Sequence, residues 1–155
     1  GPGSLPYGLG QHPAFVRTPN ARLHAQVEGV WLSGADPMPT GFTTLFPTGW
    51  DPRSGMEVSG SLIDNAYAGW SGRAHIDWPE HALRLHMRDP AVVARGRNDG
   101  FCLLYRPAEG HHFCFEPVTH PIDAFHMEGR PGLQVLETGQ TLRQAVEWRF
   151  ESLGQ

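Results

Sequence analysis

The sequence predicts an all-β fold, built as one antiparallel β-sandwich domain over residues 5–155. Apolar and polar residues alternate with a period of two in several short runs, which is the pattern of half-buried strands. Clusters of turn-forming residues separate these runs, in a chain with 19 glycines and 14 prolines among 155 residues. Sustained helical periodicity is absent, so strands and turns account for most of the chain.

Four alternating runs predict strands, and we take them in chain order. The first covers residues 23–28, and the second covers residues 83–88. The third covers residues 101–105 and stops before Pro107, while the fourth covers residues 146–151 near the C-terminus. Each run places its larger apolar side chains on one face of a strand. These side chains are Leu23, Ala25, Val27, Leu83, Leu85, Met87, Phe101, Leu103, Tyr105, Val146, Trp148 and Phe150.

The segments between the runs predict turns and one long loop. Turn clusters occupy residues 17–20, 36–41, 48–55 and 98–100. Residues 38–52 predict a loop rich in Pro, Thr and Gly, followed by a second turn-rich stretch to Gly60. Loops of that length in a compact domain are usually functional or mobile. Internal repeats and linkers are not evident, so we expect a single domain.

Composition and charge argue against two classes of partner, nucleic acids and membranes. Twelve basic residues against 16 acidic ones give a net charge of -4, without the basic run that a nucleic-acid partner requires. Cys102 and Cys114 lack CxxC spacing, which favours reduced thiols in a cytoplasmic protein. The chain also lacks the roughly 20 consecutive apolar residues that a membrane-spanning helix needs. We therefore expect neither nucleic acid nor a membrane as partner.

We interpret the first four residues, Gly1-Pro2-Gly3-Ser4, as the remnant of a cleaved expression tag. The sequence that follows begins at Leu5 without an initiator Met, which is compatible with a fragment of a longer protein.

A carboxylate stands out in the run of residues 113–118. Alternation places Phe113 and Phe115 on one face, and Cys114 and Glu116 on the other. Pro117 follows directly, and because proline cannot donate to a sheet ladder, we expect the strand to end there or to lie at an edge. A carboxylate at a strand end is well placed to reach a ligand. The alternative is a solvated glutamate on a surface strand.

Two further segments carry candidate groups. His12 lies between a glycine-rich segment and Pro13, and imidazoles exchange protons near neutral pH. Its alternative role is a loop histidine that bonds to the backbone. Asp64 lies in residues 63–70, where polar groups sit beside aromatic ones, a pattern that fits a turn equally well.

Four motifs, in this order, together resemble the aldose 1-epimerase (galactose mutarotase) family. They are Gly-x-His-Pro-x-Phe at 10–15, Ile-Asp-Asn-x-Tyr-x-Gly-Trp at 63–70, Phe-Cys-Phe-Glu-Pro-Val-Thr-His at 113–120 with Asp123-Ala124-Phe125, and Gly-Leu-x-Val-Leu-x-x-Gly at 132–139. The resemblance implies an antiparallel sandwich of the galactose mutarotase-like (supersandwich) type. It also implies interconversion of the α and β anomers of an aldohexose, without a metal or an organic cofactor.

The resemblance assigns roles residue by residue. Glu116 matches the general base that takes the proton of the anomeric hydroxyl, and His12 matches the acid that protonates the ring oxygen. Asp64 matches the acidic residue that holds sugar hydroxyls. Trp70 or Trp50 is placed to stack on a sugar face, with a core tryptophan as the alternative.

The resemblance covers only the C-terminal part of the family's longer proteins. The N-terminal portion normally supplies sheet strands, a further histidine and an arginine that contacts the sugar. A sandwich that lacks strands has unpaired edges and an exposed apolar face, both of which favour association. We therefore predict a homodimer or pairing with another chain.

Two other functions stay open at this point. A non-catalytic carbohydrate-binding module would keep the sugar site but not the turnover. A cupin-like metal-binding β-barrel would use His111, His112 and Glu116 as ligands. Adjacent histidines on a strand point to opposite faces, whereas a shared metal needs them two positions apart.

Overall fold

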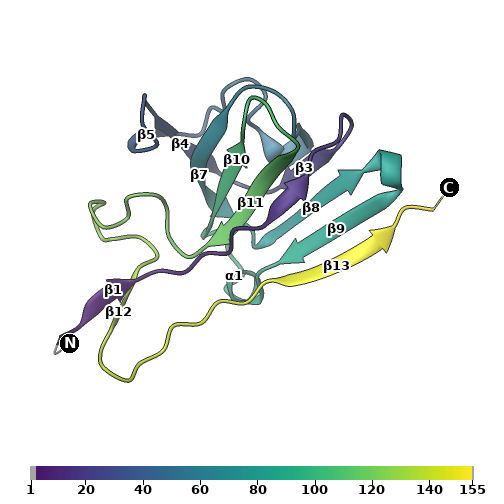
Figure 1. Ribbon diagram of the computed structural model, residues 1–155. Coiled ribbons are helices and arrows are strands. Elements are labelled where there is room, and N and C mark those ends of the chain that lie inside the picture. The colour runs from purple at the N-terminus through teal and green to yellow at the C-terminus, as the bar shows by residue number, and fades with distance from the viewer. Residues whose placement is uncertain (1–2, 155) are drawn as a thin grey trace.

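A computed structural model describes residues 3–154 and has two antiparallel sheets packed against each other, with a two-stranded arm at one side (Figure 1). The predicted all-β sandwich is thereby confirmed. Gly1 and Pro2, half of the predicted tag remnant, lie outside the described residues.

The first sheet has six strands in the order β2-β11-β10-β7-β4-β5. Its strands are β2 (Ala14–Val16), β11 (His112–Val118), β10 (Gly100–Arg106), β7 (Ile63–Trp70), β4 (Gly29–Ser33) and β5 (Pro39–Thr43).

The second sheet has five strands in the order β13-β9-β8-β3-β6. Its strands are β13 (Glu147–Ser152), β9 (Leu83–Arg88), β8 (Arg73–Trp78), β3 (Arg22–Ala25) and β6 (Met56–Glu57). β1 (Leu5–Tyr7) and β12 (Gln134–Leu136) form the arm. The helical segments are α1 (Pro90–Ala94) and the 3-10 turns at Pro52–Ser54 and Pro79–His81.

The core lies between the two sheets and follows from the period-two pattern. In β8 the inward residues Ala74, Ile76 and Trp78 are buried, while the residues between them are half-buried or exposed. Leu85 and Met87 of β9 do the same. From the six-stranded sheet, Phe113 and Phe115 of β11 pack inward, and Phe115 meets Trp70 edge-on with ring centroids 5.6 Å apart. Burial of side chains of this size contributes about 1.5–3 kcal/mol each.

The structure decides one open alternative and corrects two local predictions. Residues 63–70, whose pattern fitted a turn equally well, form the eight-residue strand β7 in the middle of a sheet. Residues 39–43, predicted as loop, pair with β4 as the edge strand β5, where a proline that cannot donate is tolerated. β11 continues through Pro117 to Val118, because Pro117 pairs with Cys102 of β10 and needs no donor on its other side. In each case tertiary pairing overrides local propensity.

Arg106 holds the long loop against the sandwich from the end of β10. Its side chain is buried, and its guanidinium donates to the backbone oxygens of Ser61, Gly49 and Glu57, each at 2.9 Å. Burial lowers the pKa of Arg106, because removal from water disfavours the charged guanidinium. One side chain thus satisfies the carbonyl of Glu57 in β6 and the two loop carbonyls of Gly49 and Ser61 on either side of this strand.

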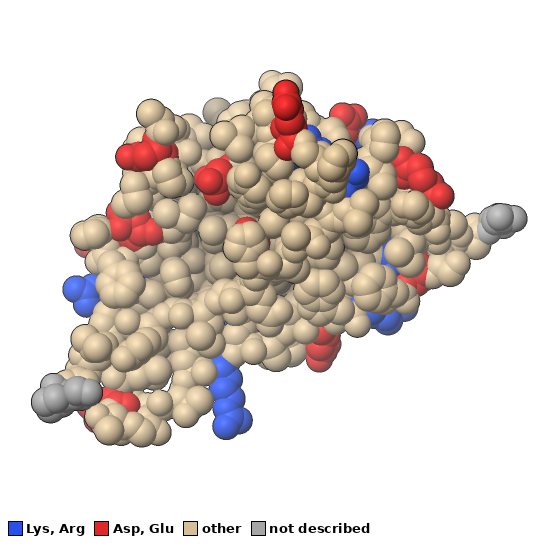
Figure 2. Space-filling model, viewed as in Figure 1, with Lys and Arg blue, Asp and Glu red and all other residues tan. Residues whose placement is uncertain are grey.

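The surface includes the outer strands of both sheets and charged side chains of both signs. β2 and β5 are the outer strands of one sheet, and β13 and β6 are the outer strands of the other, so the predicted association through edges stays a prediction. On the face drawn in Figure 2, acidic and basic side chains are interspersed rather than gathered into one patch. Among residues 3–154, no helix has the length and apolar character required to cross a bilayer.

Candidate active site

Glu116 lies on the face of the six-stranded sheet that points away from the core. In β11 it alternates with the inward Phe115, and the register places it directly opposite Leu103 of β10. Its side chain is only 10% exposed. Cys114 and Ala66 on this face are also buried, although neither belongs to the core cluster between the sheets. Glu116 is therefore a sheltered carboxylate on an outward face, not a solvated surface group.

Asp64 shares this face, two strands away. It is the cross-strand partner of Tyr105, which in turn faces Cys114 of β11. The adjacent Asn65 is buried; its amide accepts from the backbone N–H of Asp64 and donates to the carbonyl of Trp31. This amide anchors the start of β7 to β4. Asp64 is thereby fixed near the Glu116 carboxylate.

His12 reaches Glu116 because the preceding segment runs beside β11. The N–H of Gln11 donates to the carbonyl of Pro117 at 3.0 Å, and Gly10 forms a bridge with Val118. A Cβ at position 10 would lie 2.8 Å from Cγ1 of Val118, so glycine permits this close approach. The Nε2 atom of His12 then lies 3.5 Å from Oε1 of Glu116. The structure therefore brings together the three polar residues that the sequence identified.

The electrostatics of the site centre on Glu116. Burial raises the pKa of Glu116, His12 opposes the shift, and the negative charge of Asp64 adds to it. Burial raises the pKa of the Cys114 thiol to about 11, with Glu116 as a second cause. His12, Cys114 and Glu116 also lie close enough together to hold an ion, which would have to displace the thiol proton of Cys114.

The tryptophan assignments need correction. Trp70 is fully buried in the core, and its indole N–H donates to the carbonyl of Arg73, so its ring cannot face a sugar. Trp50 also packs against the core. The sequence reasoning missed Trp31, whose ring lies 6.1 Å from that of Phe101 on the face that carries Glu116. The alternation of Val30 with Trp31 was the signal, because Val30 is buried in the core and Trp31 points away from it.

The cupin-like ligand set is contradicted. His111 lies in the turn before β11, not on a strand, and the ring of His112 packs toward Tyr105 with centroids 6.1 Å apart. Both histidines lie outside the candidate metal-binding groups found among residues 3–154. Cavity size does not locate the site either, since a cavity of about 500 Å³ lies on the other sheet.

Comparison with known proteins settles the family. The family model described as aldose 1-epimerase matches residues 2–149. The chain belongs to the aldose 1-epimerase family. A curated relative, "Uncharacterized protein YphB" of Escherichia coli K12, is 29% identical over 157 residues, which is 97% of this chain and 52% of the relative. The chain therefore spans about half the length of this curated relative.

Solved structures agree with this membership. A "putative aldose 1-epimerase" from Escherichia coli K12 superposes with a TM-score of 0.87 at 25% identity, over 97% of this chain and 52% of that one. A galactose mutarotase-like protein from Clostridium acetobutylicum superposes with a TM-score of 0.77 at 14% identity, over 96% and 48%. The second shows the fold alone. The galactose mutarotase-like fold and the partial coverage expected from the sequence are confirmed.

Proposed function

We propose that the chain carries the acid and base of an aldose 1-epimerase, interconverting the α and β anomers of an aldohexose. The supporting observation is the 3.5 Å approach of His12 Nε2 to Glu116 Oε1 on a sheltered outward face. The anomeric hydroxyl and the ring oxygen are bonded to the same carbon. An acid and a base that serve both must lie close together, and these two do.

Glu116 removes the proton from the anomeric hydroxyl, and the imidazolium of His12 donates a proton to the ring oxygen. The bond between the anomeric carbon and the ring oxygen breaks, and the hydroxyl oxygen becomes the carbonyl oxygen of the open-chain aldehyde. After rotation about the bond between the first two carbons, both proton transfers reverse and the ring closes as the other anomer. Protons and electrons balance within the pair. Each well-placed proton-transfer group is worth about 10²- to 10⁴-fold in rate.

Polarimetry tests this proposal directly. Freshly dissolved α-D-glucose and α-D-galactose should lose optical rotation faster with the protein than in buffer alone. A 6-phosphorylated hexose, tested in parallel, distinguishes the substrate class. Decay at the buffer rate with every sugar would contradict turnover by this chain.

Asp64 gives a prediction about binding. In the proposed role its carboxylate accepts hydrogen bonds from sugar hydroxyls in both the ground state and the transition state. Asp64→Asn should therefore raise KM by about 10- to 100-fold, the range for a lost hydrogen bond to a charged group, and change kcat less. Initial polarimetric rates over a range of sugar concentrations separate the two constants. A fall in kcat with an unchanged KM would place Asp64 in the chemistry instead.

The Glu116 environment gives a prediction about pH. A general base must be ionised, and the pKa of this carboxyl is raised above its usual 4.5, mainly by burial. Activity should therefore decline as the pH falls, with the midpoint of the acid limb of kcat/KM above 4.5. Rates measured over the acid range, corrected for the buffer reaction at each pH, give this midpoint. A midpoint at or below 4.5 would exclude Glu116 as the base.

A sugar-binding module without turnover is the second candidate. This candidate is favoured because the chain spans only about half of its relatives' length, so it can keep a sugar site without every group needed for turnover. In this case the sugar binds but the optical rotation decays at the buffer rate. Isothermal titration calorimetry with the same sugars distinguishes this outcome from the absence of any sugar site.

A further inference from the structure

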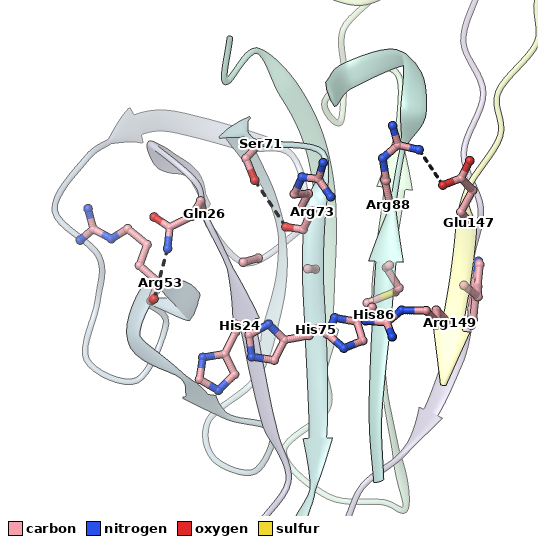
Figure 3. Close-up of a pocket in the computed structure, with 14 residues that line it drawn as sticks. His24, Gln26, Arg53, Ser71, Arg73, His75, His86, Arg88, Glu147 and Arg149 are labelled. Carbon is pink, nitrogen blue, oxygen red and sulfur yellow. Dashed lines mark hydrogen bonds and ion pairs between the residues drawn. The ribbon is translucent and has the colours of Figure 1, made fainter. Parts of the chain in front are cut away.

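The outer face of the five-stranded sheet carries a row of histidines that plays no part in the proposed proton transfer. His24 of β3 is the cross-strand partner of His75 of β8, and His75 is the partner of His86 of β9. Figure 3 shows the three rings side by side across the strands, along one wall of a cavity of about 500 Å³. All three side chains are half-buried, because alternation turns them away from the core.

Two of these histidines form a cluster with a carboxylate. The rings of His24 and His75 stack with centroids 4.2 Å apart and an angle of 11° between their planes. Asp77, two residues after His75 on the same face, directs Oδ2 at both rings. That oxygen lies 3.7 Å from Nε2 of His24 and 3.9 Å from Nε2 of His75. One donor atom from each residue lies within 4.8 Å of the other two.

We propose that His24, His75 and Asp77 bind a divalent transition-metal ion of the Zn²⁺ class, with water from the cavity completing the shell. Nitrogen and carboxylate ligands at about 2.0 Å from a tetrahedral ion lie roughly 3.3 Å from one another. On binding, the distances of 3.7 and 3.9 Å must shorten by a few tenths of an ångström, and the two rings must turn out of their stack so that both Nε2 lone pairs point at the ion. Because the ligands lie on adjacent paired strands, little chain entropy is lost on binding.

Arg84 limits the affinity of this site without blocking it. Its Nη2 donates to Oδ2 of Asp77 at 2.8 Å, and its Nε donates to Oδ1. Each carboxylate oxygen has two lone pairs, so Oδ2 can accept this bond and also bind an ion. The bond fixes the carboxylate, as outer-sphere partners of metal ligands commonly do. The nearby positive charge weakens binding, so we expect micromolar rather than tighter affinity.

Titration of the whole chain with Co²⁺, and equilibrium dialysis with Zn²⁺, test the site. We expect one equivalent of metal, with the visible absorption of tetrahedral Co²⁺. His24→Gln and His75→Gln should each weaken binding at least about tenfold, as the loss of a direct ligand must exceed the effect of an outer-sphere change. His86→Gln is the matched control, because it alters the next histidine of the same row but none of the three ligands.

A second cluster must be separated from this one. Glu116→Gln removes a donor from the group of His12, Cys114 and Glu116, and metal binding should survive this change. Saturating Zn²⁺ should also raise Tm by roughly 5–10 °C in the wild type and in His86→Gln but not in His75→Gln, since a ligand that binds only the folded state stabilises it. Absence of binding at 100 μM metal, equal binding by His75→Gln, or loss of binding in Glu116→Gln would each overturn the proposal.

Discussion

Replacement of Glu116 by Gln is expected to slow catalysed mutarotation by about 10²- to 10⁴-fold, the usual contribution of a positioned general base. The amide has the shape of the carboxylate but cannot take a proton from the anomeric hydroxyl. Because the side chain is almost fully buried, this near-isosteric change keeps the packing on β11. The measurement is the polarimetric rate above the buffer rate, with kcat and KM determined separately.

Glu109→Gln is the matched control, since it makes the same chemical change at an exposed carboxylate in the turn before β11. It should leave the rate unchanged. His12→Asn should lower kcat as well, because it removes the acid that lies 3.5 Å from the base. A Glu116→Gln protein with the wild-type rate would show that another group takes the proton.

Replacement of Arg106 by Ala is expected to lower the free energy of unfolding by about 3–5 kcal/mol. The buried guanidinium donates to three backbone oxygens, at Gly49, Glu57 and Ser61, in the segment between β5 and β7 that includes β6. Its removal leaves these acceptors without their donor and opens a space at the end of β10. Urea denaturation followed by tryptophan fluorescence measures the loss, with the m-value as a check on two-state behaviour.

Arg97→Ala is the control for this substitution. Arg97 is 74% exposed and pairs with Asp99 at the surface, where ion pairs contribute little. A small effect at Arg97 beside a large one at Arg106 would show that burial and carbonyl bonding, not charge, cause the loss. Equal and small effects would mean that water replaces the guanidinium in the loop.

The sequence predicted β9 and β10 from their alternation. Residues 83–88 match β9, with Leu85 and Met87 in the core, and residues 101–105 lie within β10. In β10 the core face carries Cys102 and Leu104 and not the larger apolar set, and the equally regular alternation of β8 was missed. β5 was missed, since Pro39 and Gly41 oppose strand formation locally and only pairing with β4 stabilises it. β7 was missed because its Asp-Asn pair is typical of turns. In the fold the side-chain amide of Asn65 donates instead to the carbonyl of Trp31 in β4.

Some residues of the candidate site could be selected from the sequence, whereas others were identified only in the folded chain. Motif order selected Glu116, His12 and Asp64, and their proximity follows from the register of β11, β10 and β7 and from the path of the segment at Gly10. Trp70 was selected by type, but its burial depends on the opposite sheet. The His24, His75 and Asp77 cluster spans β3 and β8, so no single stretch of sequence contains it.

The all-β class, the strand-borne carboxylate at Glu116 and the resemblance to the aldose 1-epimerases were determined by the sequence itself. Alternation and motif spacing are patterns of nearby residues, so they can be recognised in the sequence alone. Only the tertiary structure decided which carboxylate lies 3.5 Å from which imidazole, and which tryptophan faces outward. These depend on strand register and on pairing between distant segments, where a shift of one residue moves every side chain to the other face.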